Sequence, residues 1–353
     1  MPGRDIIVAG ASAGGVEALA RLVGGFSPDL PAAVLVVLHL PTDAHSGLPT
    51  ILGRSGPLPA THPWDGEAIE PRRIYVAPPD QHMLVQRGHI RLTRGPRENG
   101  HRPAIDPLFR TAARAYGRRA MGVVLSGLLD DGTAGLLAVK TQGGLALVQH
   151  PDDALFPGMP LSALENVEVD HSVSASELGP LLETLAQEPV EGGATPVPRH
   201  LERESKIAEL GPTDLEGEEP PGTPSGFSCP ECGGPLNELQ DGEMSRFRCH
   251  VGRAYSPDSL LAEQADSLEA ALWVALRTLE ENARLADRLA VRSHERGHSK
   301  AAAHFEERRS DARERAALIR HVLLGKAHGG QPAASESASE PSGSVTLGSR
   351  ADG

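Results

Sequence analysis

Residues 6–15, IIVAGASAGG, decide the fold, because a short apolar strand runs directly into a glycine-rich turn. The first four residues are apolar without alternation, which is typical of a strand covered on both faces. Apolar spacing over residues 16–23 then predicts a helix. A strand, a turn and a helix in this order indicate an α/β domain.

More segments of the same kind follow along the chain. Short apolar runs bounded by glycine, proline or charge predict strands over 33–38, 74–76, 121–125 and 145–148, and helical spacing covers 107–116 and 133–141. Because strands alternate with helices, the expected fold class is α/β. We expect a doubly wound, mostly parallel sheet in residues 1–190.

The residues after 190 differ in composition from the first domain and from one another. Residues 191–225 are rich in Gly, Pro and Glu and predict a flexible acidic linker. A small zinc-ribbon-like module is expected over 226–258, and an α-helical hairpin over 259–326. The last segment, 327–353, is rich in Ser, Ala and Gly and is expected to be disordered.

The helical segment carries an apolar stripe with spacings of three and four residues. It comprises Leu261, Ala265, Leu268, Leu272, Ala275 and Leu279, and after a break at Gly297 Phe305, Ala312, Ala316 and Ile319 line a second helix. This pattern predicts either a hairpin that closes its own core or a coiled coil that dimerises or binds a protein partner.

Composition excludes several classes of protein. The 353 residues carry a net charge of −13, whereas general nucleic-acid binding needs a surplus of Lys and Arg. The longest apolar run, 32–38, is far shorter than the ~20 residues that cross a bilayer, and no signal-peptide core is present. Three cysteines cannot form a disulfide framework. We therefore expect a cytoplasmic protein that neither binds nucleic acid nor inserts into membranes.

The turn after the first strand places Ser12 in the pattern G-x-S-x-G. A helix N-terminus behind such a serine supplies N–H groups and a partial positive charge that stabilise an oxyanion. The phosphate loop of a nucleotide-binding domain occupies the same position, although Ser12 stands where G-x-G-x-x-G requires its second glycine. The turn alone leaves both interpretations open.

Two further predicted strands end in polar residues of catalytic type. The run 34–38 ends in His39, and the run 123–125 leads to Asp130 and Asp131. Taken singly, an exposed histidine or a helix N-cap explains each of them. Because the carboxyl ends of strands meet at one edge of an open α/β sheet, we expect them to lie near the serine turn. A nucleophile, a base and an orienting acid require such a group of side chains.

Six separated motifs resemble the catalytic domain of chemotaxis-type (CheB-type) protein-glutamate methylesterases. In chain order they are GASAGG, VVLHLP, IYVAPPDQHM, RPAIDPLFRTAA, VVLSGLLDDGTAG and FPGMP. They cover about residues 5–185, nearly the whole first domain. The fold that this resemblance implies is doubly wound, mostly parallel α/β, in agreement with the predicted strands.

The resemblance also implies a reaction. The family's nucleophile falls on Ser12, its base on His39 and its triad acid on Asp131, and the backbone N–H groups of Leu128 and Ala13 are candidates for the oxyanion hole. The implied substrate is a methylated chemoreceptor or related signalling protein, whose glutamate methyl esters are hydrolysed without a cofactor. Deamidation of glutamine would use the same acyl intermediate.

The chain departs from the family pattern at several positions. Leu128 replaces a Met, Leu129 replaces a Gly, Asp130 adds a negative charge that is expected to perturb His39, and Leu161 stands where Arg is common. The family also carries a phosphoryl-receiver domain ahead of the catalytic domain. Because the resemblance begins at residue 5, we expect that switch to be absent.

The three cysteines of the chain lie within 21 residues. Cys229 and Cys232 form C-x-x-C followed by two glycines, and Cys249 precedes His250. This pattern predicts a structural Zn²⁺ site with these four ligands. Adjacent ligands reach one metal with difficulty, so His294, His298, His304 or a solvent molecule are alternatives for the fourth position. A redox pair is a further alternative, without the βαβ setting expected for one.

Two classes of function follow from these observations. The first is a serine hydrolase with protein-glutamate methylesterase activity in chemotaxis-like signal transduction. The second is a non-catalytic adaptor that uses the same fold and its zinc and helical extension to bind a protein. A nucleotide-binding domain is a third and weaker interpretation. His82, His101, Arg102 and Arg110 receive no assigned role.

Overall fold

The computed structural model describes residues 3–40, 46–190, 195–209, 222–242 and 244–325. The tail predicted over 327–353 lies outside the described residues, as do parts of the expected linker. The chain divides into two compact units, one up to Ala265 and one from Asp266 onward.

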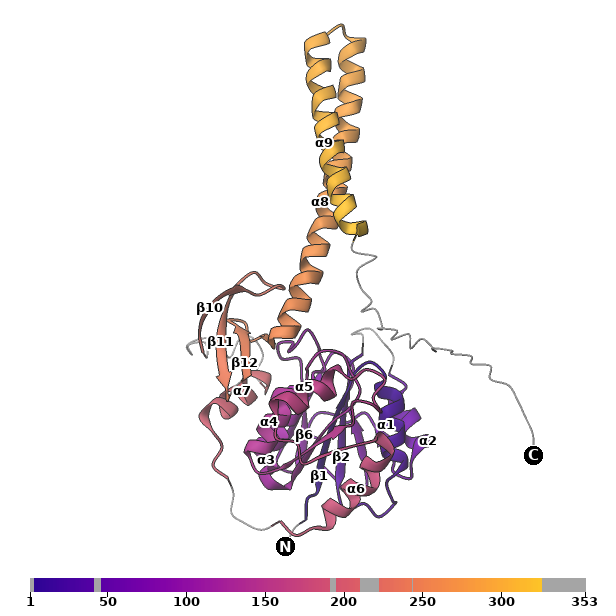
Figure 1. Ribbon diagram of the computed structural model, residues 1–353, viewed down its shortest axis with the longest axis vertical. Coiled ribbons are helices and arrows are strands. Elements are labelled where there is room, and N and C mark those ends of the chain that lie inside the picture. Colours follow the sequence, from indigo (N-terminus) through magenta and orange to yellow (C-terminus); the bar gives the residue numbers. More distant parts are fainter. Residues whose placement is uncertain (1–2, 41–45, 191–194, 210–221, 243, 326–353) are drawn as a thin grey trace, which may run out of the picture. The chain divides into compact units, whose positions relative to one another are not determined.

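A seven-stranded sheet forms the centre of the first unit (Figure 1). Its order is β3-β4-β2-β1-β7-β8-β9, and every neighbouring pair is parallel. The strands are β1 Ile6–Ala11, β2 Ala33–Leu38, β3 Ala60–Thr61, β4 Ile74–Val76, β7 Ala120–Val124, β8 Leu145–Gln149 and β9 His171–Val173. The predicted parallel α/β sheet is confirmed.

Helices cover both faces of this sheet (Figure 1). One face packs against α1 Gly15–Gly24, α2 Leu48–Ser55 and α6 Ala175–Gln187, and the other against α3 Ile105–Tyr116, α4 Thr133–Thr141 and α5 Gly158–Asn166. An antiparallel ribbon, β5 His82–Gln86 with β6 His89–Thr93, also packs on the second face, and the 3₁₀ turn η1 Gly117–Arg119 precedes β7. Because successive side chains of β1 enter opposite cores, this strand is apolar without alternation.

The register of the central strands brings the carboxyl ends of three strands, β1, β2 and β7, to the same edge of the sheet. Ala11 pairs with Leu38, and Gly10 pairs with Val124. The residues that follow β1, β2 and β7 therefore leave the sheet at nearly the same level, at its carboxyl edge. Sites form at this edge in open α/β sheets.

Part of the expected linker is a helix that packs against the first domain. Residues Arg199–Glu209 form α7, and Leu201, Ile207 and Ala208 are at most 4% exposed. The hydroxyl of Thr93 on β6 donates to the carbonyl of Ala208 over 2.8 Å. Composition alone missed this helix, since its few apolar residues fall on one face.

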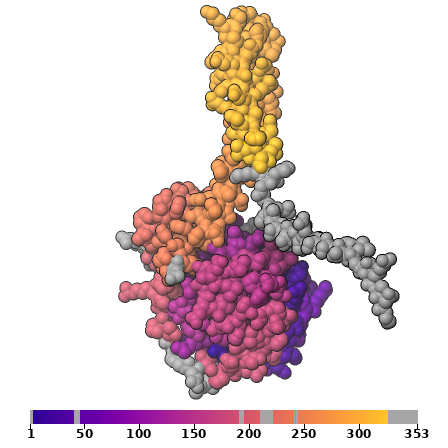
Figure 2. All heavy atoms as spheres, viewed as in Figure 1, coloured from indigo at the N-terminus to yellow at the C-terminus, as the bar shows by residue number. Residues whose placement is uncertain are grey.

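The cysteine module is a four-stranded antiparallel sheet in the same unit. Its strands are β10 Thr223–Ser228, β11 Pro235–Asp241, β12 Met244–Cys249 and β13 Ala254–Tyr255. Its small core contains Cys229, Leu236, Phe247, Cys249, Tyr255 and Leu260. Figure 2 shows its orange surface beside the magenta surface of the α/β domain.

The predicted helical hairpin is also confirmed. It consists of α8 Pro257–Glu295 and α9 Ser299–Gly325, joined through Gly297. Leu276, Ala316 and Leu323 form its buried core, whereas Leu261 and Leu268 of the expected stripe are exposed. No helix in the described part of the chain is both long and apolar enough to span a bilayer.

Candidate active site

Ser12 lies directly after β1, where the chain turns into α1. The turn passes through Gly14, whose φ of 69° is a left-handed conformation that glycine adopts without strain. The backbone N–H of Ser12 donates to the carbonyl of Ser126 over 2.9 Å, and the Ser126 hydroxyl donates to the carbonyl of Ala13 over 2.8 Å. The segment after β7 therefore fixes the backbone around the Ser12 side chain.

His39 follows β2 and lies between Ser12 and Asp131. Its Nδ1 is 3.1 Å from Ser12 Oγ, and its Nε2 is 2.7 Å from Asp131 Oδ2. Because a carboxylate can only accept, the proton of neutral His39 lies on Nε2. Nδ1 is then free to accept the Ser12 hydroxyl proton. The structure thus brings these three side chains into one chain of hydrogen bonds.

Asp131 lies between β7 and α4, with its side chain 3% exposed. Besides His39, the backbone N–H of Ile105 donates to it over 2.7 Å and the amide of Asn99 over 2.9 Å. Ile105 begins α3, so the partial positive charge of that helix end faces the carboxylate. Burial opposes ionisation, but the bonds from His39 and Ile105 hold the pKa of Asp131 well below its ordinary value. Asp131 is therefore an anion that can orient His39 and stabilise its charged form.

A tight turn at Asn99 and Gly100 contributes to the site and was missed by the sequence analysis. Both residues have positive φ, 51° and 77°, and Glu98 pairs with His101 across them. An Asn-Gly dipeptide is the strongest short signal of such a hairpin turn, so this feature was readable in the sequence. The turn brings the Asn99 amide within hydrogen-bond distance of Asp131 and places the ring of His101 against the ring of His39.

The rings of His101 and His39 are stacked, with their centroids 3.6 Å apart and an interplanar angle of 18°. Burial, followed by the charge of His39, lowers the pKa of His101 to about 4. His101 is therefore neutral at pH 7. It supports one face of His39 without placing a second positive charge beside it.

A second buried carboxyl group, Asp106, holds the loop that carries Asp131. It accepts hydrogen bonds from the backbone N–H groups of Gly132 at 3.1 Å and Gly135 at 2.7 Å, and from the amide of Asn99 at 3.1 Å. Burial and the charge of Asp131 raise the pKa of Asp106. The two carboxyl groups therefore have opposite pKa shifts, and it is Asp131 that faces His39.

The residues before Asp131 depart from the resembling family, and the structure shows how each is accommodated. Leu129 has a φ of 58°, a left-handed backbone conformation that residues other than glycine seldom adopt. The carboxylate of Asp130 accepts a hydrogen bond from the Ser256 hydroxyl at 2.6 Å, on the side of the cysteine module. Burial raises the pKa of Asp130 to about 6. The added charge therefore bonds to Ser256 rather than to His39.

The proposed oxyanion donors, Ala13 and Leu128, lie on two loops that meet beside Ser12. A Cβ atom on Gly127 would lie 2.9 Å from the Cβ of Ser12 and 2.0 Å from the sulfur of Met159, so only glycine fits there. Among the hydrogen bonds of the described residues, none uses the N–H of Ala13 or of Leu128. Both groups are therefore available to a ligand.

A cavity of about 480 Å³ opens next to this loop. Its wall includes Leu129, Asp130, Leu161 and Glu165 of the α/β domain, together with Met244 and Pro257. The cysteine module and the start of α8 thus form one side of a cavity whose other side is the loop before Asp131.

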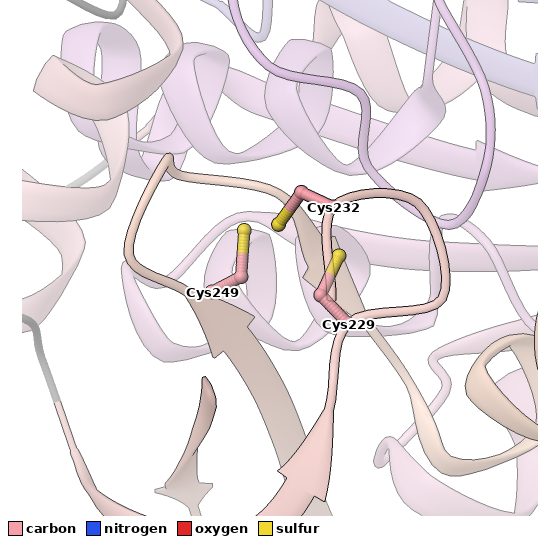
Figure 3. Close-up of side chains that lie close together, drawn as sticks. All are labelled: Cys229, Cys232 and Cys249. Carbon is pink, nitrogen blue, oxygen red and sulfur yellow. The ribbon is translucent and has the colours of Figure 1, made fainter. Parts of the chain in front are cut away.

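The thiols of Cys229, Cys232 and Cys249 form a cluster (Figure 3). Their sulfur atoms all lie within 4.8 Å of one another, and Cys232 is exposed while the other two are buried. Within the described residues, the ring of His250 does not belong to this cluster. The structure therefore brings three of the four predicted ligands together.

These residues fit a metal ion. The Tyr255 hydroxyl and the backbone N–H groups of Cys232 and Glu231 face the sulfur of Cys229 and, against the effect of burial, lower its pKa. Burial opposes the charge of Arg253, but Glu231, Cys229 and Cys249 raise its pKa. Three thiolates on a divalent ion leave one negative charge, and the Arg253 guanidinium near these sulfur atoms is itself paired with Glu231 at 2.8 Å. The cluster could therefore bind a metal.

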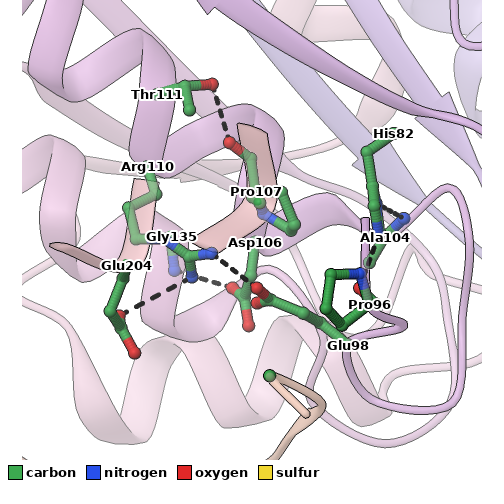
Figure 4. A network of polar contacts seen from close by, with 12 residues as sticks. His82, Pro96, Glu98, Ala104, Asp106, Pro107, Arg110, Thr111, Gly135 and Glu204 are labelled. Carbon is green, nitrogen blue, oxygen red and sulfur yellow. Dashed lines mark hydrogen bonds and ion pairs between the residues drawn. The ribbon is translucent and has the colours of Figure 1, made fainter. Parts of the chain in front are cut away.

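Buried charges join the module, α7 and the α/β domain, and Figure 4 shows Glu98, Arg110 and Glu204 among them. Glu98 accepts hydrogen bonds from Arg110 at 2.7 Å and from Arg248 at 3.3 Å, while Glu204 accepts from Arg248 at 3.0 Å and from Arg246 at 2.6 Å. Burial opposes ionisation, but the arginine charges lower the pKa of both glutamates. All five side chains are therefore charged, and Arg246 and Arg248 of the module pair with Glu204 of α7 and Glu98 of the α/β domain.

Comparisons with known proteins cover the α/β domain. Residues 7–182 match the family model described as CheB methylesterase. The chain is 35% identical over 183 residues to protein-glutamate methylesterase/protein-glutamine glutaminase 2 of Anaeromyxobacter dehalogenans and 37% identical over 190 residues to enzyme 1 of that name from Caulobacter vibrioides. These alignments cover 52% and 53% of this chain and 54% and 55% of the relatives. The chain thus spans about half the length of the curated relatives that it matches.

A solved structure also matches about half of this chain. The catalytic domain of Thermotoga maritima CheB methylesterase is similar over its whole length and over 52% of this chain, at 30% identity and a TM-score of 0.50. Residues 7–182, which the family model matches, include Ser12, His39 and Asp131. The cysteine module and the helical hairpin lie beyond the residues that the family model matches.

Proposed function

The chain belongs to the CheB methylesterase family, and from this premise we propose that its α/β domain is a serine hydrolase that removes methyl esters from glutamate side chains of a signalling protein. The observation that carries the proposal is the hydrogen-bonded chain from Ser12 through His39 to Asp131. A nucleophile, a base and an orienting acid are what ester hydrolysis through an acyl-enzyme requires.

In the proposed mechanism, Ser12 Oγ attacks the carbonyl carbon of the ester, and its proton passes to Nδ1 of His39. Asp131 holds the imidazole through Nε2 and stabilises the positive charge that develops on it. His39 then gives the proton to the departing methoxy group, so that methanol leaves and an acyl-Ser12 ester remains. Water, activated by His39, hydrolyses this ester and releases the glutamate acid.

The backbone N–H groups of Ala13 and Leu128 would bind the oxyanion of both tetrahedral intermediates. Their lack of other hydrogen bonds in the described structure supports this role. So does their position, since one follows the nucleophile and the other belongs to a loop packed against it. The loss of one such donor typically costs about 3–4 kcal/mol of barrier.

The proposed substrate is a methylated chemoreceptor or a related signalling protein. The names of the relatives describe both a methylesterase and a glutaminase. A primary amide would form the same acyl-Ser12 ester with ammonia as the leaving group, so we include glutamine deamidation in the proposal.

We also propose a structural Zn²⁺ in the cysteine module, bound by Cys229, Cys232 and Cys249, with His250 or solvent as the fourth ligand. Zinc prefers thiolate ligands in tetrahedral geometry, and the three clustered sulfur atoms support this choice. The ion would stabilise a module whose own core is small. The catalytic steps above do not involve it.

The test is methanol release from a methylated receptor fragment. Ser12→Ala should lower turnover by at least 10³-fold, because the nucleophile is lost while binding remains. Ser55→Ala is the matched control, since Ser55 lies on α2 and its hydroxyl bonds only to the carbonyl of Ile51. Equal turnover of Ser12→Ala and the parent protein would overturn the proposed mechanism.

A further inference from the structure

The turn at residues 97–101 lies between Asp131 and the cysteine module. On one side, the backbone N–H of Asn99 donates to the carbonyl of Ala254 over 2.8 Å, and the N–H of Ala254 donates to the carbonyl of Arg97 over 3.3 Å. On the other side, the turn supplies the Asn99 amide to Asp131. One short segment therefore contacts both the candidate active site and β13.

The side chain of Asn99 is hydrogen-bonded at both of its ends. Its NH₂ group donates to Asp131 at 2.9 Å and to Asp106 at 3.1 Å. Its carbonyl oxygen accepts from the backbone N–H of Ser256 at 3.0 Å and from the hydroxyl of Ser259 at 2.9 Å. These five residues are at most 6% exposed, so water does not compete for their bonds.

The two serines and the two carboxyl groups favour the same orientation of the Asn99 amide. An amide can present either its donors or its acceptor to a given neighbour. If Asn99 were turned over, its carbonyl oxygen would face the carboxyl groups of Asp131 and Asp106, and its NH₂ group would face the donors of the module. With Ser256 and Ser259 in place, the observed orientation satisfies every group.

The same pair of serines reaches the neighbour of Asp131. The Ser256 hydroxyl donates to Asp130 Oδ1 over 2.6 Å and lies 2.7 Å from the hydroxyl of Ser259. Residues 130 and 131 are therefore both held, one directly and one through Asn99, by two residues that follow β13.

We propose that Ser256 and Ser259 are positioning residues of the active site: they orient Asn99, which holds Asp131 in place against His39. The cysteine module and the start of α8 are then a built-in part of the catalytic machinery. This inference rests on the proposed function and extends it to a region that lies beyond the matched catalytic domain.

The buried charges fasten the module at the position that this contact requires. Glu98 precedes Asn99 and is paired with Arg248 on β12. Glu204 on α7 is paired with Arg248 and Arg246. Removing one member would leave an unpaired buried charge, so the docked arrangement depends on every member of this network.

The experiment compares full-length Ser259→Ala, and the double variant with Ser256→Ala, with the parent protein. Two readouts are measured below the unfolding temperature: kcat and KM for methanol release, and the rate at which a fluorophosphonate labels Ser12. We expect kcat and the labelling rate to fall about tenfold with KM unchanged, because substrate contacts remain and only the orientation of Asp131 and His39 is lost. Ser225→Ala is the matched control, since it removes a hydrogen bond to Leu236 within the module.

The control should stay within twofold of the parent in both readouts. Parental labelling and kcat in Ser259→Ala, or an equal fall in Ser225→Ala, would overturn the positioning role while leaving the hydrolase assignment intact. If the parent is labelled at Ser12 but releases no methanol, the proposed substrate is wrong and the labelling rates still decide the positioning role. A parent that is not labelled at Ser12 would overturn both proposals.

Discussion

The α/β domain and the cysteine module are stabilised by different interactions. The domain has apolar cores on both faces of a seven-stranded sheet, and its proposed catalytic side chains lie where strands end. The module has a core of six residues, two of which are cysteines, and it contacts the domain through buried ions and serine hydroxyls. Apolar packing therefore determines the first structure, whereas polar pairing between residues far apart in sequence determines how the second is attached.

This difference predicts where the removal of a polar side chain should lower stability most. A polar side chain removed from the surface of the α/β domain leaves its cores intact. A polar side chain removed from the module or its interface leaves a buried charge, a buried donor or a metal site without its partner, which costs more free energy than a lost surface contact.

The largest expected effect is the loss of the metal site. Cys232→Ser should lower the zinc content from about one ion per chain to almost none and should speed proteolysis of residues 222–255 at least tenfold, because the module's core alone is small. Cys232 is exposed, so the change removes a ligand without leaving a cavity. Elemental analysis and limited proteolysis check it, with Ser228→Ala as control. A parent protein that is folded and free of zinc would contradict the zinc proposal.

The second largest expected effect is the loss of stability when one buried charge is removed. Glu204→Gln should lower the free energy of unfolding by about 3 kcal/mol at pH 7, because Arg246 and Arg248 lose their buried counter-charge. Glu202→Gln, whose side chain is 44% exposed, is the matched control and should cost less than about 0.5 kcal/mol. Urea unfolding measures both.

The loss of stability in Glu204→Gln should depend on pH. Burial opposes ionisation of Glu204, but the arginines depress its pKa in the folded protein below the unfolded value of 4.5. The stabilisation is therefore present above about pH 4.5 and is lost as the pH falls toward the folded pKa. Equal losses for Glu204→Gln and Glu202→Gln would contradict the assigned role of the ion pairs.

The smallest effect is a gain in stability at Asp130. Burial raises its pKa to about 6 from 3.8, so its charge destabilises the folded protein above about pH 6. Asp130→Asn keeps an acceptor for Ser256 and should add about 2 kcal/mol at pH 8, with the gain vanishing below about pH 4. Urea unfolding at the two pH values measures it, and Asp152→Asn, at a side chain 95% exposed, is the control. A gain that is the same at both pH values would show that Asp130 does not titrate as described.

The α/β fold could be predicted because its signals are local. Unbroken apolar runs such as 33–38 are the strands, and the predicted helix at 133–141 coincides with α4. The convergence of residues 12, 39 and 131 followed from one topological rule, that the carboxyl ends of parallel strands meet at one edge. Short elements such as β3 contain too few residues for a hydrophobic period to be visible, so their boundaries could not be predicted.

The rest of the site depends on contacts that no local pattern contains. Asn99 is important because Asp131, Asp106, Ser256 and Ser259 surround it, and these partners come from three separate segments. The burial of α7 was hidden for a similar reason. Glu204 would oppose burial on its own, and its partners lie more than 40 residues away.

The buried ion pairs also decide which solution conditions can separate the module from the domain. Glu98, Glu204, Arg110 and Arg248 are each at most 2% exposed, so dissolved sodium chloride cannot reach between them, and the Debye screening that weakens surface pairs has little effect. The attachment is therefore expected to be equally firm in dilute buffer and in a high-salt chromatography wash.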